Sequence, residues 1–255
     1  MTYISFPSFE RRPLLANRRK PIQAPPLSYR TAGVIGGLGQ LSTGLFYDAI
    51  TKICTSQHLV ANPRLIINSV NTWEVTSILD RKDLEALYFF LKEEIKLLAG
   101  QIDFLVMVCN SVHAVLRPLR DHFDFPILSI YEEVCKEIAL LQYRKVGVLG
   151  TKTTLNSQFY QSELQSYGIA YEVLPEQDLE ILDHCIFQEI LHGQGNDKMK
   201  ILLLEGVDYL ASRGCEAVVL ACTELPLFIT QADTEVPLFS STEILAKVVV
   251  EECFR

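Results

Sequence analysis

Apolar and polar positions along the chain follow a pattern that is typical of buried strands separated by helices. Short runs of apolar and β-branched residues recur from residue 31 onward. The strands predicted from these runs cover residues 31–36, 65–70, 103–108, 127–130, 145–150, 217–221 and 238–239. Strands that alternate with helical segments indicate βαβ units and parallel sheets, so the predicted fold class is α/β.

One of the intervening helices is clear from its spacing. Between Leu84 and Leu98, apolar residues recur at intervals of three and four. This spacing places them on a single helix face. The segment is therefore predicted to be an amphipathic helix.

The second half of the chain repeats landmarks of the first half. Four landmarks return in the same order, 111 to 114 residues later. Gly-Val-Ile-Gly at residues 33–36 corresponds to Gly-Val-Leu-Gly at residues 147–150, and Gly100 corresponds to Gly214. Cys109 corresponds to Cys222, and segment 125–129 corresponds to segment 236–240. The alternative is that unrelated βαβ units share glycines and apolar strands of this kind. We interpret the repeat as a duplication, which predicts two similar halves with a ligand cleft at the carboxyl ends of their strands.

Cys109 and Cys222 each follow a predicted strand, one in each half. Two halves that face one another would present these thiols to one ligand from opposite sides. Racemisation needs such a pair, because one group removes the Cα proton and the other returns a proton to the opposite face. Helices expected to begin just after each cysteine would lower the thiol pKa values through their dipoles. The pair therefore predicts acid–base chemistry at a Cα atom.

Composition narrows the class of protein. The 255 residues are 49% hydrophobic and 21% charged, which fits one large domain or two small ones. Seven widely spaced cysteines without a Cys-x-x-Cys motif argue against a disulfide framework or a structural zinc site, and they indicate a reducing, cytoplasmic location. We expect no membrane span and no secretory signal. The net charge of −8 argues against non-specific nucleic-acid binding.

Residues 1–30 form a basic, proline-rich N-terminal extension. They contain six basic residues and five prolines but one acidic residue. The simpler interpretation is a poorly ordered tail. The alternative is an arm that packs on the acidic remainder of the chain or on a neighbouring subunit.

Four segments are similar to motifs of the aspartate/glutamate racemase family. Residues 109–113 read Cys-Asn-Ser-Val-His and resemble the family's Cys-Asn-Thr-x-His. Residues 222–227 read Cys-Thr-Glu-Leu-Pro-Leu and match its second motif, with Ala221 in place of the preceding glycine. Residues 33–43 and 150–154 resemble the loops that open the two halves. The likeness runs from about residue 31 to residue 255, and the second motif looks most like that of aspartate racemases.

The resemblance implies two pseudo-symmetric α/β domains with four-stranded parallel sheets and an active site in the cleft between them. Residues 31–128 together with 240–255 would form the first domain, and residues 129–239 the second. The implied activity is the interconversion of L- and D-aspartate by Cys109 and Cys222 as the acid–base pair. The resemblance also implies a homodimer and no pyridoxal phosphate, metal or nucleotide.

The resemblance further suggests which residues bind the substrate. They are Gly37, Asn110, Ser111, Val112, Thr151 and Thr223. Backbone N–H groups at these turns could hold a carboxylate and stabilise negative charge that develops at Cα. Some aspartate racemases carry an arginine and a lysine where residues 71–76 and 189–193 have neither. Three alternatives therefore remain. The substrate is glutamate rather than aspartate, or the protein is a related two-cysteine isomerase or decarboxylase that acts on another diacid. The third is a catalytically silent protein that binds an amino acid.

Three further signals are weaker. Gly37 and Gly39 do not complete a dinucleotide-binding fingerprint. His113, four residues after Cys109, allows a cysteine–histidine hydrolase pair, but a polar residue that caps or lines the cleft is the simpler interpretation. Glu224 is expected either to orient a neighbouring group or to face solvent, and it is not expected to act as a base.

Overall fold

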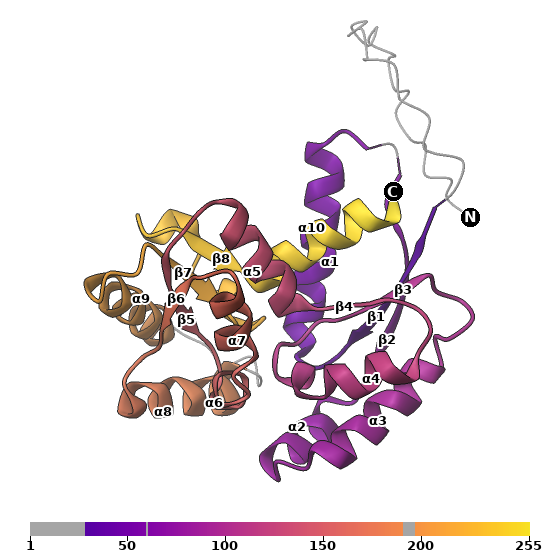
Figure 1. The fold of residues 1–255 in the computed structure, drawn as a ribbon, viewed down its shortest axis with the longest axis horizontal. Coiled ribbons are helices and arrows are strands. Elements are labelled where there is room, and N and C mark those ends of the chain that lie inside the picture. Colours follow the sequence, from indigo (N-terminus) through magenta and orange to yellow (C-terminus); the bar gives the residue numbers. More distant parts are fainter. Residues whose placement is uncertain (1–28, 60, 191–196) are drawn as a thin grey trace, which may run out of the picture.

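A computed structural model describes residues 29–59, 61–190 and 197–255 (Figure 1). Its strands form two parallel sheets of four strands each. The first sheet, in the order β2-β1-β3-β4, contains β1 (Thr31–Gly36), β2 (Arg64–Ser69), β3 (Phe104–Met107) and β4 (Ile127–Leu128). The second, in the order β6-β5-β7-β8, contains β5 (Lys145–Leu149), β6 (Ala170–Glu172), β7 (Ala217–Leu220) and β8 (Leu238–Ser240). The two orders correspond strand for strand, which confirms the predicted α/β fold with two similar parallel sheets.

The predicted strands all correspond to strands of the sheets, but sequence reasoning missed β6. This strand has three residues, all of them half-buried or exposed, and lies at the edge of the second sheet. It therefore lacks the apolar run that marks a buried strand. Most of the N-terminal extension lies outside the described residues.

Helices cover both faces of the first sheet. One face packs against α2 (Thr72–Asp80), α3 (Leu84–Lys96) and α4 (Leu116–His122). The other face packs against α1 (Gln40–Ser56) and α10 (Ser241–Cys253). The amphipathic helix predicted from its spacing is α3, which buries Leu87, Leu91 and Ile95. Burial of these apolar faces on both sides is what a parallel sheet requires.

The second sheet is surrounded by the remaining helices. They are α5 (Ile130–Leu140), α6 (Lys152–Asn156), α7 (Phe159–Ser166), α8 (Glu176–Cys185), the π-helix η2 (Ile186–Ile190) and α9 (Asp197–Ser212). Among the described residues, no helix is long and apolar enough to cross a membrane.

The C-terminal helix joins the two halves. From β8 of the second sheet, α10 runs back to the first half and lies beside α1 (Figure 1). It also contacts α5, where Lys247 Nζ binds the Glu137 carboxylate at 2.9 Å. The packing of α10 with the first half agrees with its expected membership of that domain, although α5 contacts elements of both halves. The exact domain boundaries stay a prediction.

Candidate active site

Cys109 and Cys222 line one cavity of about 30 Å³ between the halves. Cys109 lies two residues beyond the end of β3, and Cys222 lies two residues beyond the end of β7. Since β3 and β7 are the corresponding strands of the two sheets, the duplication brings the thiols to equivalent places. The expected juxtaposition of the two cysteines is therefore present in the structure.

The turns after the cysteines differ from the predicted α-helices. Residues Ser111–Val115 form a 3₁₀ helix, η1, and residues Leu225–Leu227 form another, η3. Such short elements cannot build up the dipole of a long helix, although their N–H groups still point at the thiol. The N–H groups of Ser111 and Val112 and the Ser111 hydroxyl lower the pKa of Cys109.

Burial dominates the electrostatics of both thiols. Burial, with a smaller contribution from the charge of Glu224, raises the pKa of Cys109 to about 12. The same two causes raise the pKa of Cys222 well above its ordinary value. The expectation that helix dipoles bring the thiols toward neutral pKa values is therefore wrong, because loss of hydration outweighs them. A base at this site needs a partner that takes the thiol proton.

Glu224 is the carboxyl group that accepts a hydrogen bond from Cys222. The Cys222 thiol donates to Glu224 Oε2 at 3.3 Å, and the Thr223 hydroxyl donates to the same oxygen at 2.9 Å. Glu224 is 4% exposed, and burial raises the pKa of its carboxyl group. The side chain reaches the thiol because Glu224 lies two residues after Cys222 in a tight turn. Of the two interpretations from sequence, orienting a neighbouring group is the one that the geometry supports.

Hydroxyl groups connect the two halves at the cavity. Ser111 Oγ lies 3.1 Å from Thr151 Oγ1 and 3.0 Å from Thr154 Oγ1. Thr151 also caps α6 by accepting from the backbone N–H of Thr154 at 3.2 Å. Ser111, Thr151 and Thr223 all line the cavity, as expected for substrate-binding residues.

Asn110 lines the cavity, but other protein groups already engage its amide. Its Nδ2 donates to Ser241 Oγ at 3.1 Å, and its Oδ1 accepts from the Tyr160 hydroxyl at 2.8 Å. Ser241 in turn donates to the carbonyl oxygen of Leu220 at 2.8 Å. These bonds tie the turn after Cys109 to the end of β7, so the geometry gives the Asn110 side chain a positioning role.

Gly37 and Val112 lie beside the cavity and do not line it. Val112 is buried in the core of the first half. Gly37 has φ of +75°, and a Cβ there would approach Val70 O to 2.3 Å. Its N–H donates to Thr43 Oγ1 at 2.9 Å. Gly37 therefore shapes the loop before α1, and the neighbouring Leu38 is the residue of this loop that lines the cavity.

His113 is held by backbone groups rather than by a thiol. Its Nε2 accepts from the N–H of Ile130 at 3.2 Å, so in the neutral ring Nδ1 carries the proton and donates to Cys109 O at 2.8 Å. Burial lowers the pKa of His113 to about 4. The ring is therefore neutral and structural, which argues against a cysteine–histidine hydrolase pair.

The remaining wall of the cavity was missed by sequence reasoning. It consists mainly of apolar residues from three elements: Leu38, Thr76, Leu79, Ile186 and Phe187. No lysine or arginine is among the described residues that line the cavity. No local motif marks these positions, because they become neighbours only when α2 and η2 of opposite halves meet. Elsewhere in the described residues, no group of three or more His, Cys, Asp or Glu side chains could hold a metal ion.

Comparison with known proteins agrees with this arrangement. The family model "Asp/Glu/Hydantoin racemase" matches residues 35–249. The chain belongs to the Asp/Glu/hydantoin racemase family. It is thus an isomerase, an amino-acid racemase of this family, and its substrate is not defined by the family likeness.

Individual members of the racemase family cover most of the chain. The broad specificity amino-acid racemase RacX of Bacillus subtilis is 27% identical over 225 residues, which are 86% of this chain and 96% of that protein. The crystal structure of an aspartate racemase homologue from Pyrococcus horikoshii OT3 is 31% identical, with a TM-score of 0.76 over 89% of this chain and all of that one. Picrophilus torridus aspartate racemase shares the fold. It is 22% identical, with a TM-score of 0.67 over 88% of this chain and 94% of that one.

Proposed function

We propose that this chain racemises an amino acid by a two-base mechanism in which Cys109 and Cys222 act on opposite faces of Cα. The observation that carries the proposal is that the two thiols, from equivalent turns of duplicated halves, line one cavity. A thiolate accepts the Cα proton while the opposing thiol delivers its own proton to the other face. The thiolate and the thiol have then exchanged roles, which suits a reversible reaction between enantiomers.

The proposed first step is proton transfer from Cys222 to Glu224. The thiol already donates to Glu224 Oε2, and burial raises the pKa of this carboxyl group above its ordinary value. Proton transfer leaves a Cys222 thiolate beside a neutral carboxyl group. The thiolate then removes the Cα proton, and the Cys109 thiol supplies a proton to the opposite face. Each proton starts and ends on a named group of the chain or the substrate, so the mechanism proceeds without a cofactor.

The substrate's α-carboxylate is proposed to lie against Ser111, Thr151 and Thr223. The hydroxyl groups of Ser111 and Thr151, together with backbone N–H groups of the turn after Cys109, can donate hydrogen bonds to the carboxylate, whereas the Thr223 hydroxyl already donates to Glu224. Donors in a water-excluded site also stabilise the negative charge that develops when the Cα proton leaves. Aspartate is the substrate that the Cys-Thr-Glu-Leu-Pro-Leu motif favours, with glutamate next.

The proposal is tested by hydrogen exchange at Cα. Purified protein without added pyridoxal phosphate is incubated in D₂O with L-aspartate, L-glutamate and uncharged L-amino acids. We expect deuterium at Cα and accumulation of the D-enantiomer of at least one substrate. Absence of exchange with every amino acid would contradict the proposed function.

Single-thiol variants identify the acid–base pair. Cys109→Ala and Cys222→Ala should each abolish racemisation, because each thiol is needed in both directions. Cys215→Ala is the matched control, since Cys215 is buried in the second half and does not line the cavity. If either cavity variant racemises at the control rate, the two-thiol mechanism is wrong.

We also propose that the protein is a homodimer. Large apolar residues of α1 and α2 are exposed, among them Leu41 and Tyr47 of α1 and Trp73 at the start of α2. Trp73 is 73% exposed, which is unusual for a large aromatic side chain. Light scattering should give the mass of two chains, and Trp73→Ser should shift the protein toward the monomer if Trp73 lies in the interface.

A further inference from the structure

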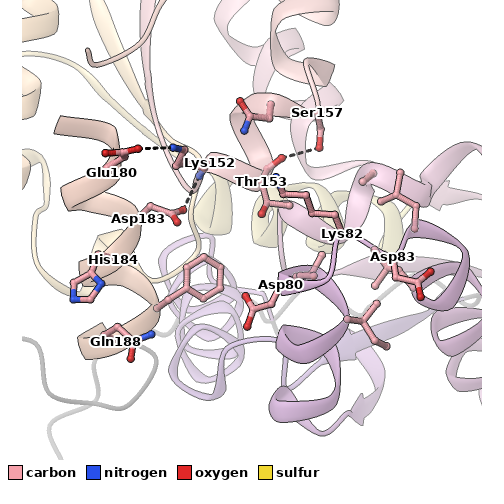
Figure 2. A pocket seen from close by; sticks show the side chains of 17 residues that line it. Asp80, Lys82, Asp83, Lys152, Thr153, Ser157, Glu180, Asp183, His184 and Gln188 are labelled. Atoms are coloured by element: carbon pink, nitrogen blue, oxygen red, sulfur yellow. Dashed lines mark hydrogen bonds and ion pairs between the residues drawn. The ribbon is translucent and has the colours of Figure 1, made fainter. Parts of the chain in front are cut away.

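The cavity with the two thiols shares a wall with a second, larger pocket. The larger pocket has a volume of about 630 Å³ and opens between the two halves. Its residues come from the segment joining α2 to α3 on one side and from α6 and α8 on the other (Figure 2). Leu79 and Phe187 line both spaces, and they are the only described residues that do so. These two side chains, here called the Leu79–Phe187 wall, separate the thiol cavity from the outer pocket.

The wall comes from both halves. Leu79 belongs to α2 of the first half and is buried, whereas Phe187 belongs to the π-helix η2 of the second half and is half-buried. A π-helix is an uncommon element that often occurs at functional sites. A cavity of about 30 Å³ holds one or two water molecules. An amino acid is larger than this space, so side chains that line it, such as Leu79 and Phe187, must move when a substrate binds.

The lining of the thiol cavity is of two chemical kinds. Ser111 and Thr151 contribute hydroxyl groups within hydrogen-bond distance of one another, and these suit the charged α-carboxylate. Leu38, Leu79, Ile186 and Phe187 contribute apolar side chains. A substrate whose carboxylate meets the hydroxyl groups leaves its side chain against the apolar part of this lining.

We propose that the Leu79–Phe187 wall determines specificity by closing the side-chain end of the substrate site, and that the preferred substrates carry small, uncharged side chains. This inference rests on the proposed racemase function and deepens it. It differs from aspartate, which the motif alone favours, because the structure shows what the side chain would contact.

An acidic side chain finds no cationic partner among the described residues that line the thiol cavity. A buried carboxylate without a hydrogen-bonded cation is costly, and no lysine or arginine is among the described residues that line the thiol cavity. The buried Glu224 would add repulsion between like charges.

The outer pocket beyond the wall is also unfavourable for an anion. Asp80 and Asp183 approach it from opposite halves (Figure 2). Burial raises the pKa of Asp183, and the charge of Asp80 adds to this effect. Two lysines are also among the described residues that line the pocket. Lys152 Nζ already binds Glu180 and Glu176. Lys82 leaves one cation against the carboxyl groups of Asp80, Asp83 and Asp183. A longer side chain that passed the wall would therefore meet carboxylates on both sides.

Removing the larger side chain of the wall tests the proposal in two ways. Phe187→Ala joins the thiol cavity to the outer pocket, while Phe89→Ala, at an exposed phenylalanine of α3, is the matched control. The first measurement is the kcat/KM of each protein for alanine, serine, leucine, phenylalanine, aspartate and glutamate. The second is the rate at which N-ethylmaleimide alkylates Cys109 and Cys222, followed by peptide mass spectrometry, which needs no turnover.

For catalysis, wild type should act faster on alanine or serine than on leucine, phenylalanine, aspartate and glutamate. Phe187→Ala should raise the kcat/KM for leucine and phenylalanine, relative to that for alanine, by about tenfold or more, since each buried methylene is worth that order of discrimination. Aspartate or glutamate as the best wild-type substrate would overturn the assignment of substrate class. An unchanged ratio of large to small substrates in Phe187→Ala would overturn the role of the wall.

For alkylation, Phe187→Ala should modify Cys109 and Cys222 about tenfold faster than wild type or Phe89→Ala. Equal rates in all three proteins would show that the wall does not separate the thiols from the outer pocket. Because alkylation does not depend on turnover, a protein without racemase activity would refute the proposed function and still leave the wall tested by this arm.

Discussion

The Cys222 thiol donates a hydrogen bond to Glu224 Oε2 at 3.3 Å, whereas the other oxygen of the same carboxyl group, Oε1, has no hydrogen-bond partner among the described residues. Cys109 has no carboxyl group in the corresponding position, since its turn supplies a hydroxyl group and backbone N–H groups. The two thiols are thus equivalent in the fold but unequal in their surroundings. This difference makes Glu224 the most informative position for testing the proposed mechanism.

Glu224→Gln should lower kcat by about 100-fold or more, the usual contribution of a general acid–base group, because the amide cannot accept the thiol proton. The two enantiomers have equal free energy, so kcat/KM must fall equally in both directions. The difference between the two thiols should instead appear in the primary deuterium isotope effect at Cα. In Glu224→Gln we expect this isotope effect to rise for the enantiomer whose proton Cys222 removes, and to stay unchanged for the other enantiomer. Isotope effects that change equally for both enantiomers would contradict this role.

The pH profile provides a second readout for Glu224. The carboxyl group accepts a proton only when it is ionised, and burial raises its pKa. In wild type, kcat/KM should therefore fall as the pH drops below this raised pKa, and Glu224→Gln should lack that acidic limb. Glu85→Gln, at an exposed position of α3, should keep the wild-type profile.

Gly39→Ala should disturb Glu224 without altering any catalytic group. A Cβ at Gly39 would lie 1.4 Å from Glu224 Oε1, so the buried carboxyl group must move away from Cys222. We expect a loss of kcat similar to that of Glu224→Gln, and a double variant no worse than either single one, since coupled residues are not additive. Gly44→Ala is the control, because nothing lies within 4 Å of its Cβ and alanine favours helix α1. Independent, additive losses would show that Gly39 acts elsewhere.

His113 should make the fold less stable in acid. Its folded-state pKa of about 4 lies below the ordinary value of 6.5, so between these values the unfolded chain binds a proton that the folded chain does not. Stability contributed by the neutral ring is present above about pH 6.5 and is lost as the pH falls toward 4, by about 3 kcal/mol in total. Urea unfolding should show this loss in wild type and in His122→Gln, an exposed control, but not in His113→Gln. A parallel loss in all three proteins would contradict the assignment.

Tyr160→Phe should destabilise the protein and loosen the turn that carries Cys109. The substitution leaves Asn110 Oδ1 buried without its 2.8 Å hydrogen bond, at a cost of about 1–3 kcal/mol. Chemical denaturation measures this cost, and Tyr167→Phe, at an exposed tyrosine, should change stability little. A fully stable Tyr160→Phe protein would show that Asn110 finds another donor.

The sequence by itself determined the architecture and indicated the two candidate cysteines. Strand runs such as residues 31–36 and the spacing of α3 are local patterns, because burial of a strand or a helix face is written in neighbouring residues. The duplication placed Cys109 and Cys222 at equivalent strand ends. Segment 170–172 escaped prediction because a short edge strand buries too little apolar surface to leave such a pattern.

Tertiary structure alone decided how the site works. Side chains far apart along the chain meet only after folding, so nothing local indicated that Tyr160 engages Asn110 or that Leu79 and Phe187 share a wall. Burial depends on the same distant contacts, and it reversed the expected direction of the thiol pKa values. The motif identified the two cysteines, whereas the packing of the two halves determined which groups surround them.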